Sequence, residues 1–394
     1  MPEVRPGPWL KLIAVGAAGA AALAVVSGAL SLHTAHRALA ALAVPPLAAL
    51  VAAAWVAHRR LLAPSVAALA SFLAAALVVG RPLHIGFAAL ALAAALVATA
   101  ATLHGEPVAA APWRDYVTLT KPRIMTLLLL TGACGMVVGA GGFPSAWLFV
   151  VTMAGLALAC GGASALNHVI DRDIDRHMRR TDRRPVAADR VAPTRALEFG
   201  LALTALSFVL LASLVNVTTA LLALAGNLFY VFVYTRWLKR STPQNIVIGG
   251  AAGAVPPLVG WAAATGNVTV PALLLFAIVF FWTPPHFWAL ALLIRRDYEA
   301  AGVPMLPVVR GERETTKQIL LYTVVLVAVT ASPFLYGTLG LPYLVAALVL
   351  GAAFFALALG LRREPTPRRA ALLFHFSLLY LALLFAAMAL DAAL

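Results

Sequence analysis

The sequence changes from apolar to strongly charged within one stretch, AWLFVVTMAGLALACGGASALNHVIDRDIDRHMRRTDRRP, residues 146–185. Residues 146–166 carry no charge and are long enough to cross a bilayer as a helix. Five of the chain's 15 acidic residues then follow between Asp171 and Asp189, interleaved with arginines. A transmembrane helix that runs directly into such a cluster indicates a membrane protein with a polar site at the bilayer surface.

The composition of the whole chain supports a membrane protein. Of its 394 residues, 62% are hydrophobic and only 11% are charged, whereas soluble domains average about 25% charged residues. The net charge of +14 does not indicate a nucleic-acid partner, because the basic residues fall in short clusters between apolar segments. Cys134 and Cys160 both lie inside apolar segments, so no disulfide framework is expected.

Apolar segments of spanning length recur along the chain and predict an all-α polytopic membrane protein. We predict thirteen spans: 12–31, 37–56, 62–80, 84–103, 124–142, 146–166, 195–214, 217–235, 245–264, 270–292, 318–337, 341–361 and 371–390. With these spans, only Arg37 and Arg81 of the 29 lysines and arginines lie on one side of the membrane, and all the others lie on the opposite side. Because cytoplasmic loops are enriched in positive charge, we expect a cytoplasmic N-terminus, an outer C-terminus and location in the cell membrane.

The polar segment 104–122 contains three prolines and is predicted to be a cytoplasmic linker. It divides the chain into a four-helix transmembrane module, residues 1–103, and a nine-helix domain, residues 123–394.

Asn167, Asp171 and Asp175 are spaced four residues apart, which on a helix places them along one face with a rise of about 6 Å between neighbours. Amide and carboxylate oxygens suit Mg²⁺, and the arginines that follow suit phosphate. Two interpretations are open: a solvated loop whose acids and arginines pair with each other, or a magnesium and diphosphate site. We favour the second, because the row begins inside an apolar span.

The row resembles the first Asp-rich motif, N-x-x-x-D-x-x-x-D, of the UbiA family of intramembrane prenyltransferases. Three further stretches occur in the family's order and resemble its heme-modifying branch, the protoheme IX farnesyltransferases or heme O synthases: YTRWLKRSTPQNIVIGGAAGAVPPLVGW (234–261), FWTPPHFWALA (281–291) and DYEAAGVPMLPVVRG (297–311). The resemblance covers residues 113–394. It implies a nine-helix UbiA-type bundle around a cavity that opens to lipid, with the active site at the cytoplasmic face.

The resemblance also implies roles for particular residues. One or two Mg²⁺ ions would be held, and catalysis carried, by Asn167, Asp171, Asp175 and Asp297. The diphosphate would be bound by Arg180, Arg183, Lys239 and Arg240, although interfacial anchoring also explains the last two. Many relatives have two aspartates here at D-x-x-x-D spacing, whereas this sequence has Asp297 and a nearby glutamate, Glu299. The number of metal ions therefore stays open.

The implied reaction transfers the farnesyl group of farnesyl diphosphate to the 2-vinyl group of heme B and gives heme O. Two alternatives are a UbiA-type prenyltransferase of an aromatic quinone precursor and a polytopic heme transporter. His286 lies beside Pro284 and Pro285 inside an apolar span, and it would either bind the heme or bond to a carbonyl that the prolines leave free.

The N-terminal module carries His36 and His84 at the outer ends of two predicted spans. Two imidazoles from facing helices can ligate heme, and GALSLHTAHRALA and GRPLHIGFAALA resemble half of a heme A synthase. Interfacial histidines on a helical anchor are the alternative. If the module binds heme, heme A synthase or a second copy of this chain would be a partner in the membrane.

Overall fold

The structure is a computed structural model that describes residues 8–29, 43–51, 62–77, 91, 94–95, 98 and 111–394. None of these residues belongs to a strand, and most are helical. The prediction of an all-α fold is therefore confirmed.

Within residues 111–394, nine helical segments are long and apolar enough to span a membrane. They coincide with the nine spans predicted after the linker, and they make the chain an integral membrane protein. The first five are α6 (Pro122–Ala140), α7 (Ala146–Ile170), α9 (Pro193–Leu214), the continuous segment of α10 (Val217–Leu228), η2 (Phe229–Leu238) and α11 (Lys239–Ser241), and α12 (Asn245–Thr265). The last four are α13 (Val270–Leu293), α16 (Gly311–Thr330) with α17 (Ser332–Leu335), α18 (Leu341–Arg363) and α19 (Pro367–Ala393).

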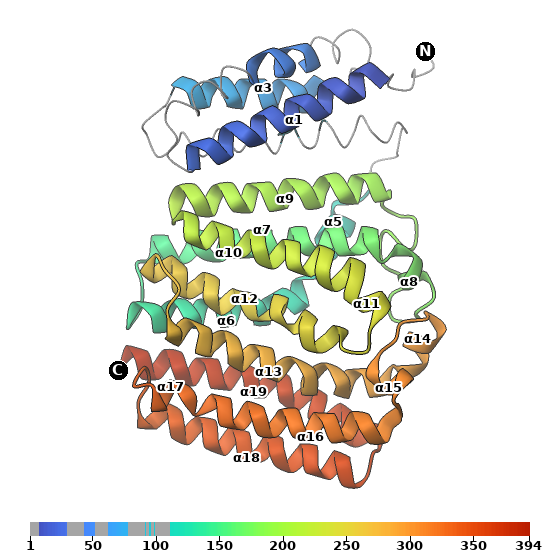
Figure 1. Cartoon of the computed structure of the whole chain (residues 1–394), viewed down its shortest axis with the longest axis vertical. Coiled ribbons are helices and arrows are strands. Elements are labelled where there is room, and N and C mark those ends of the chain that lie inside the picture. The colour runs from blue at the N-terminus through green and yellow to red at the C-terminus, as the bar shows by residue number, and fades with distance from the viewer. Residues whose placement is uncertain are drawn as a thin grey trace.

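The long helices of residues 111–394 lie side by side along one direction (Figure 1). α9 packs on α7, α12 packs on α6 and α13, and α13 packs on α16 and α19. The C-terminal helices share an apolar core that includes Trp288, Tyr343, Phe354 and Phe385.

Three short helices connect the long ones, α8 (Arg172–Arg176), α14 (Arg295–Ala300) and α15 (Leu306–Val309), and a fourth, α5 (Trp113–Leu119), precedes α6. In Figure 1, α8, α11, α14 and α15 gather at one end of the bundle, and the C-terminus lies at the opposite end. The charged stretches that follow α7, η2 and α13 therefore meet at one end.

Close packing of α6 on α12 depends on glycines. A Cβ atom on Gly260 would collide with the carbonyl oxygen of Gly132, and one on Gly135 would collide with the backbone of Pro257. Small residues let the two helix backbones approach where no hydrophobic effect drives association. Because Lys121 directly precedes the first residue of α6, this contact also fixes the position of Lys121 relative to α12.

The described part of the N-terminal region includes α1 (Pro8–Ala29), α3 (Leu62–Leu77) and helical residues 43–51. Their alanine and leucine side chains share one apolar cluster, which includes Ala14, Leu47 and Ala68. The predicted spans 37–56 and 84–103 fall largely outside the described residues, and so do His36 and His84.

Candidate active site

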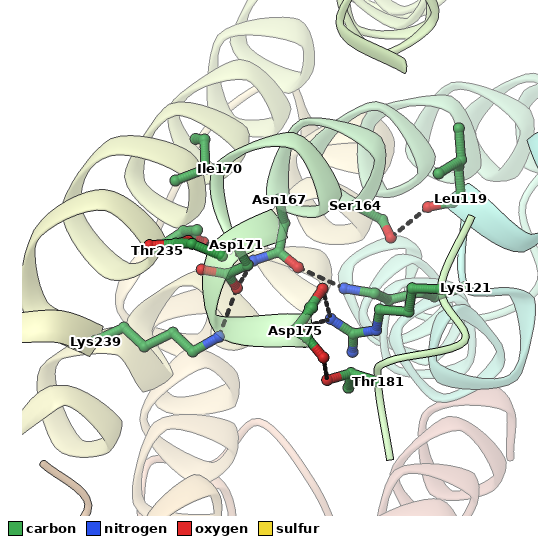
Figure 2. Close-up of polar contacts among 12 residues, drawn as sticks. Leu119, Lys121, Ser164, Asn167, Ile170, Asp171, Asp175, Thr181, Thr235 and Lys239 are labelled. Carbon is green, nitrogen blue, oxygen red and sulfur yellow. Dashed lines mark hydrogen bonds and ion pairs between the residues drawn. The ribbon is translucent and has the colours of Figure 1, made fainter. Parts of the chain in front are cut away.

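The row of polar side chains predicted at the end of α7 is present and buried. α7 ends at Ile170 and α8 begins at Arg172, but helical backbone hydrogen bonds continue through Asp171 between them. The N–H of Asp171 donates to Asn167 O at 2.9 Å, and the N–H of Asp175 donates to Asp171 O at 2.8 Å. The spacing therefore keeps the three residues on one face (Figure 2), and none is more than 2% exposed.

Three cations face this row. Lys239 Nζ lies 2.5 Å from Asp171 Oδ2, and Arg184 donates to both carboxylate oxygens of Asp175 at 2.8 Å. Lys121 Nζ donates to Asn167 Oδ1 at 2.7 Å. The acids pair with cations, as the loop interpretation expected, but they do so in the protein interior, where breaking a pair leaves an uncompensated charge.

Asn167 links three helices through its amide group. Its Nδ2 donates to Asp171 Oδ2 at 2.7 Å and to Thr235 Oγ1 at 3.1 Å, while its Oδ1 accepts from Lys121. Both ends of the amide are therefore engaged, which fixes its orientation and joins the start of α6 to α7 and η2.

Tyr230 and Lys239 lie on the same side of the fourth spanning segment because that segment contains a π-helix, η2. On a regular α-helix, at about 100° per residue, Tyr230 and Lys239 would point to opposite sides. The wider turn of a π-helix, about 4.4 residues, brings them to the same side. The rings of Tyr230 and Tyr234 stack with centroids 5.5 Å apart, and both rings line a cavity beside the row.

This cavity has a volume of about 330 Å³ and largely apolar walls from α6, α7, α10, η2, α12, α13 and α19. Lys121, Ser164 and Tyr234 line it near the acidic row. Thr131, ten residues from Lys121 along α6, and Leu156, eight residues from Ser164 along α7, also line it, which corresponds to a depth of roughly 12–15 Å. Lys121 bonds to Asn167 of the row and also lines the cavity, so a ligand with an anionic head and an apolar chain would contact both the row and the cavity wall.

Of the four basic residues predicted to bind diphosphate, Lys239 alone contacts the row at hydrogen-bond distance. Arg240 lies 3.9 Å from Asp171 Oδ1 but pairs with both oxygens of Asp173 at 2.6 Å, which lowers the pKa of Asp173 to about 2.

The other two predicted arginines, Arg180 and Arg183, are exposed at the same end of the bundle. Arg180 lies near Tyr298 of α14. Burial raises the pKa of Tyr298 to about 12, an effect that Arg180 partly offsets.

Asp297 lies half-buried in the first turn of α14. Among the described residues, no hydrogen bond or ion pair joins Asp297 to the row. The same part of the chain contains no group of three or more Asp, Glu, His or Cys side chains close enough to hold a metal ion. Of the predicted ligand set, the structure therefore brings together Asn167, Asp171 and Asp175 but does not add Asp297.

His286 bonds to a side chain and not to a carbonyl. Its Nδ1 lies 2.6 Å from Ser377 Oγ, and the Ser377 hydroxyl donates its own proton to Phe374 O at 2.7 Å. Nδ1 must therefore be the protonated nitrogen, which leaves the Nε2 lone pair available to a ligand. The ring stacks on Trp282, with centroids 4.2 Å apart, and Trp282 lines the cavity.

Lys121, Arg184 and Thr235 were not among the predicted site residues. Lys121 has a left-handed backbone conformation, φ 51°, immediately before Pro122 at the start of α6. Burial, and next the nearby Arg184, lower the pKa of Lys121 well below its usual value. The one sequence signal was a lysine next to a proline at the start of an apolar span, inside the segment predicted to be a linker.

A buried row of oxygen ligands and cations beside an apolar cavity, within a helical membrane bundle, defines an intramembrane enzyme for a substrate with an anionic head and an apolar chain. The match to known families agrees with this class. The chain belongs to the UbiA prenyltransferase family, whose model matches residues 128–386, and it is a prenyltransferase.

The chain is 59% identical over 280 residues to the protoheme IX farnesyltransferase of Symbiobacterium thermophilum, with 71% of this chain and 94% of the relative covered. It is 52% identical over 278 residues to the protoheme IX farnesyltransferase of a Roseiflexus species, of which it spans only 52%.

Two solved structures share the fold. A digeranylgeranylglyceryl phosphate synthase matches with a TM-score of 0.61 at 18% identity, covering 71% of this chain and 98% of the other. A UbiA homolog from Archaeoglobus fulgidus bound to DMAPP and Mg²⁺ matches with a TM-score of 0.50 at 19% identity, covering 70% and 99%.

Proposed function

We propose that this prenyltransferase is a protoheme IX farnesyltransferase, which joins the farnesyl group of farnesyl diphosphate to the 2-vinyl group of heme B and produces heme O. The observation that carries the proposal is the shared position of Lys121, which bonds to the buried row and also lines the apolar cavity. The relative of the same name at 59% identity supports the choice of substrates.

The donor set of the row fits Mg²⁺. Asp171 is 0% exposed, and its Oδ1 has no hydrogen-bond partner among the described residues. A buried carboxylate oxygen without a partner is costly unless a cation binds it, and Mg²⁺ prefers oxygen ligands with substrate phosphate. Asn167, Asp171 and Asp175 would hold the ion, and Asp297 would join them for a second one. Bound Mg²⁺ supplies positive charge that stabilises the leaving diphosphate.

The protein's own side chains would neutralise the rest of the diphosphate charge. The two carboxylates of the row are paired with Lys239 and Arg184, and Lys121 adds a third basic group beside Asn167, so the basic groups of this set outnumber the acids. Arg180, Arg183 and Arg240 add further positive charge at the same end. Preorganised cations in a site of low dielectric constant stabilise charge that develops as the C1–O bond of the prenyl diphosphate breaks.

The apolar cavity would protect the allylic cation that this bond cleavage leaves at farnesyl C1. The terminal carbon of the heme vinyl group forms the new bond to C1, and water adds to the cationic carbon next to the ring. That water then loses a proton, which gives a hydroxyethylfarnesyl group, and diphosphate is the other product. His286 would contact the heme from behind the cavity wall, where its ring stacks on Trp282.

We place the protein in the cell membrane with a cytoplasmic N-terminus, an outer C-terminus and the active site at the cytoplasmic face. The gathering of α8, α11 and α14 at one end, where their loops carry arginines, supports this orientation. Residues 1–103 would form a separate module that binds heme through His36 and His84, with heme A synthase or a second copy of the chain as partner. Loss of a heme absorption band when both histidines are changed to alanine in the full chain would test the module.

The experiment for the main proposal is mass analysis of pigments from cells that make heme B as their sole heme and express the full chain. We expect a farnesylated, hydrated heme from the wild type and none from Asp171→Ala. Asp189→Ala is the matched control, because Asp189 is an exposed acid that also pairs with arginines. A prenylated aromatic acid in place of heme O would favour the quinone-precursor enzyme. Heme uptake without any prenylated product would favour a transporter.

A further inference from the structure

Arg240 contacts two carboxylates that differ sharply in burial. Its guanidinium pairs with both oxygens of Asp173 at 2.6 Å and lies 3.9 Å from Asp171 Oδ1. Asp171 is buried, whereas the side chain of Asp173 is 63% exposed. A third bond, from Arg240 to the carbonyl of Ile170 at 2.8 Å, holds the guanidinium at the end of α7. Arg240 therefore sits at the boundary between the buried row and the solvent.

The solvent side of this boundary is a polar depression of about 220 Å³. It is lined by Asp173, Ile174, His177, Arg240 and residues 301–303 of the loop after α14. The depression gives the Asp173 carboxylate room to move away from Arg240 without disturbing a packed core.

A bidentate arginine–carboxylate pair has the geometry of a bidentate arginine–phosphate pair. Asp173 therefore occupies the donors of Arg240 that a diphosphate next to Asp171 would use. Because Asp173 is largely exposed, its pairing energy is small, and a multiply charged ligand can replace it.

Resting on the proposed function, we propose that Asp173 is a resident counter-ion for Arg240 that the substrate's diphosphate displaces. Asp173 thereby weakens the binding of diphosphate and, by pairing with Arg240 again after the reaction, speeds release of the diphosphate product. Asp173 is a positioning residue, since it acts through Arg240 and need not touch the substrate.

Isothermal titration of the full chain in detergent with inorganic diphosphate and Mg²⁺ tests the proposal. Asp173→Asn should lower the dissociation constant roughly two- to fivefold, the range expected for removing an exposed competing pair. In steady-state kinetics the same variant should show a lower KM for farnesyl diphosphate, stronger inhibition by inorganic diphosphate and no rise in kcat. If Asp173 had a merely structural role, the variant would have a lower kcat and no tighter binding of diphosphate.

Two further variants separate this mechanism from a general loss of negative charge. Asp189→Asn removes an acid of similar exposure, 60%, that pairs with Arg172 and Arg176, and it should leave the affinity unchanged. In an Arg240→Gln background, Asp173→Asn should no longer tighten binding. Tightening that persists without Arg240, equal tightening by Asp189→Asn, or unchanged or weaker binding in Asp173→Asn would each overturn the proposal. Failure of the wild type to bind diphosphate with Mg²⁺ would instead remove the proposed function itself, and this inference with it.

Discussion

Changing Lys239 to methionine removes one partner of the most buried ion pair at the site. The side chain of Lys239 is 11% exposed, that of Asp171 is 0% exposed, and the two charged atoms lie 2.5 Å apart. Methionine keeps most of the length of the lysine side chain, so the change deletes the charge with little change in packing. Asp171 then keeps the hydrogen bond that Asn167 donates to it, and its nearest remaining cation among the described residues is the guanidinium of Arg240, 3.9 Å from Asp171 Oδ1.

The expected loss of stability follows from this geometry. Breaking a buried pair by removing one partner costs about 3–5 kcal/mol, because the remaining charge stays desolvated. Arg240 compensates part of this, so we expect about 3 kcal/mol for Lys239→Met. The double variant Asp171→Asn/Lys239→Met leaves neither charge unpaired and should lie within about 1 kcal/mol of the wild type.

The assay is the free energy of unfolding of the purified full chain, from circular dichroism during titration with a denaturing detergent. Farnesyl transfer is measured on the same samples. The double variant should recover stability but not activity, since it lacks Asp171, which would hold Mg²⁺, and Lys239, which would contact the diphosphate. Losses of stability that simply add in the double variant would refute the argument that the pair is coupled and buried.

Four further outcomes are expected. Lys121→Gln should raise the KM for farnesyl diphosphate about tenfold, the scale of one charge-assisted hydrogen bond, as steady-state kinetics would measure. Removal of divalent ions with EDTA should abolish transfer, and added Mg²⁺ should restore it; transfer that survives chelation would contradict the magnesium site. Gly253→Leu should lower kcat/KM for farnesyl diphosphate more than for geranyl diphosphate, because Gly253 lines the cavity and nothing lies within 4 Å of an added Cβ, so the new side chain would occupy cavity space. Asp391→Ala should cost about 1 kcal/mol of stability without changing KM, because the Asp391 carboxylate accepts from the N–H groups of Gly340 and Tyr343 at the far end of α18.

The spans after residue 111 could be predicted because length and apolar character are local properties of a sequence. The shared face of Asn167, Asp171 and Asp175 was also local, since it needed only helical spacing, and that spacing survives the change from α7 to α8. Both predictions depended on residues close together in the chain.

The partners of the row could not be predicted in the same way. Lys121 is 46 residues from Asn167, and only the packing of α6 brings the two together. The family resemblance assigned Arg180 and Arg183 to the diphosphate, but the fold of the loop turns their neighbour Arg184 onto Asp175. Choosing among such neighbours requires the direction of each side chain, which spacing alone does not give for an irregular loop.

The π-helix η2 is the most important feature of the site that the sequence analysis did not predict. Phe229–Leu238 are aromatic, aliphatic and polar residues that a spanning α-helix would also accept, so composition carries no sign of the wider turn. In the structure Tyr230 lines the cavity and lies nine residues before Lys239, a spacing that an α-helix would turn to opposite sides. The wider turn of η2 brings Tyr230 and Lys239 to the same side of the segment, where the apolar chain and the anionic head of the substrate would meet.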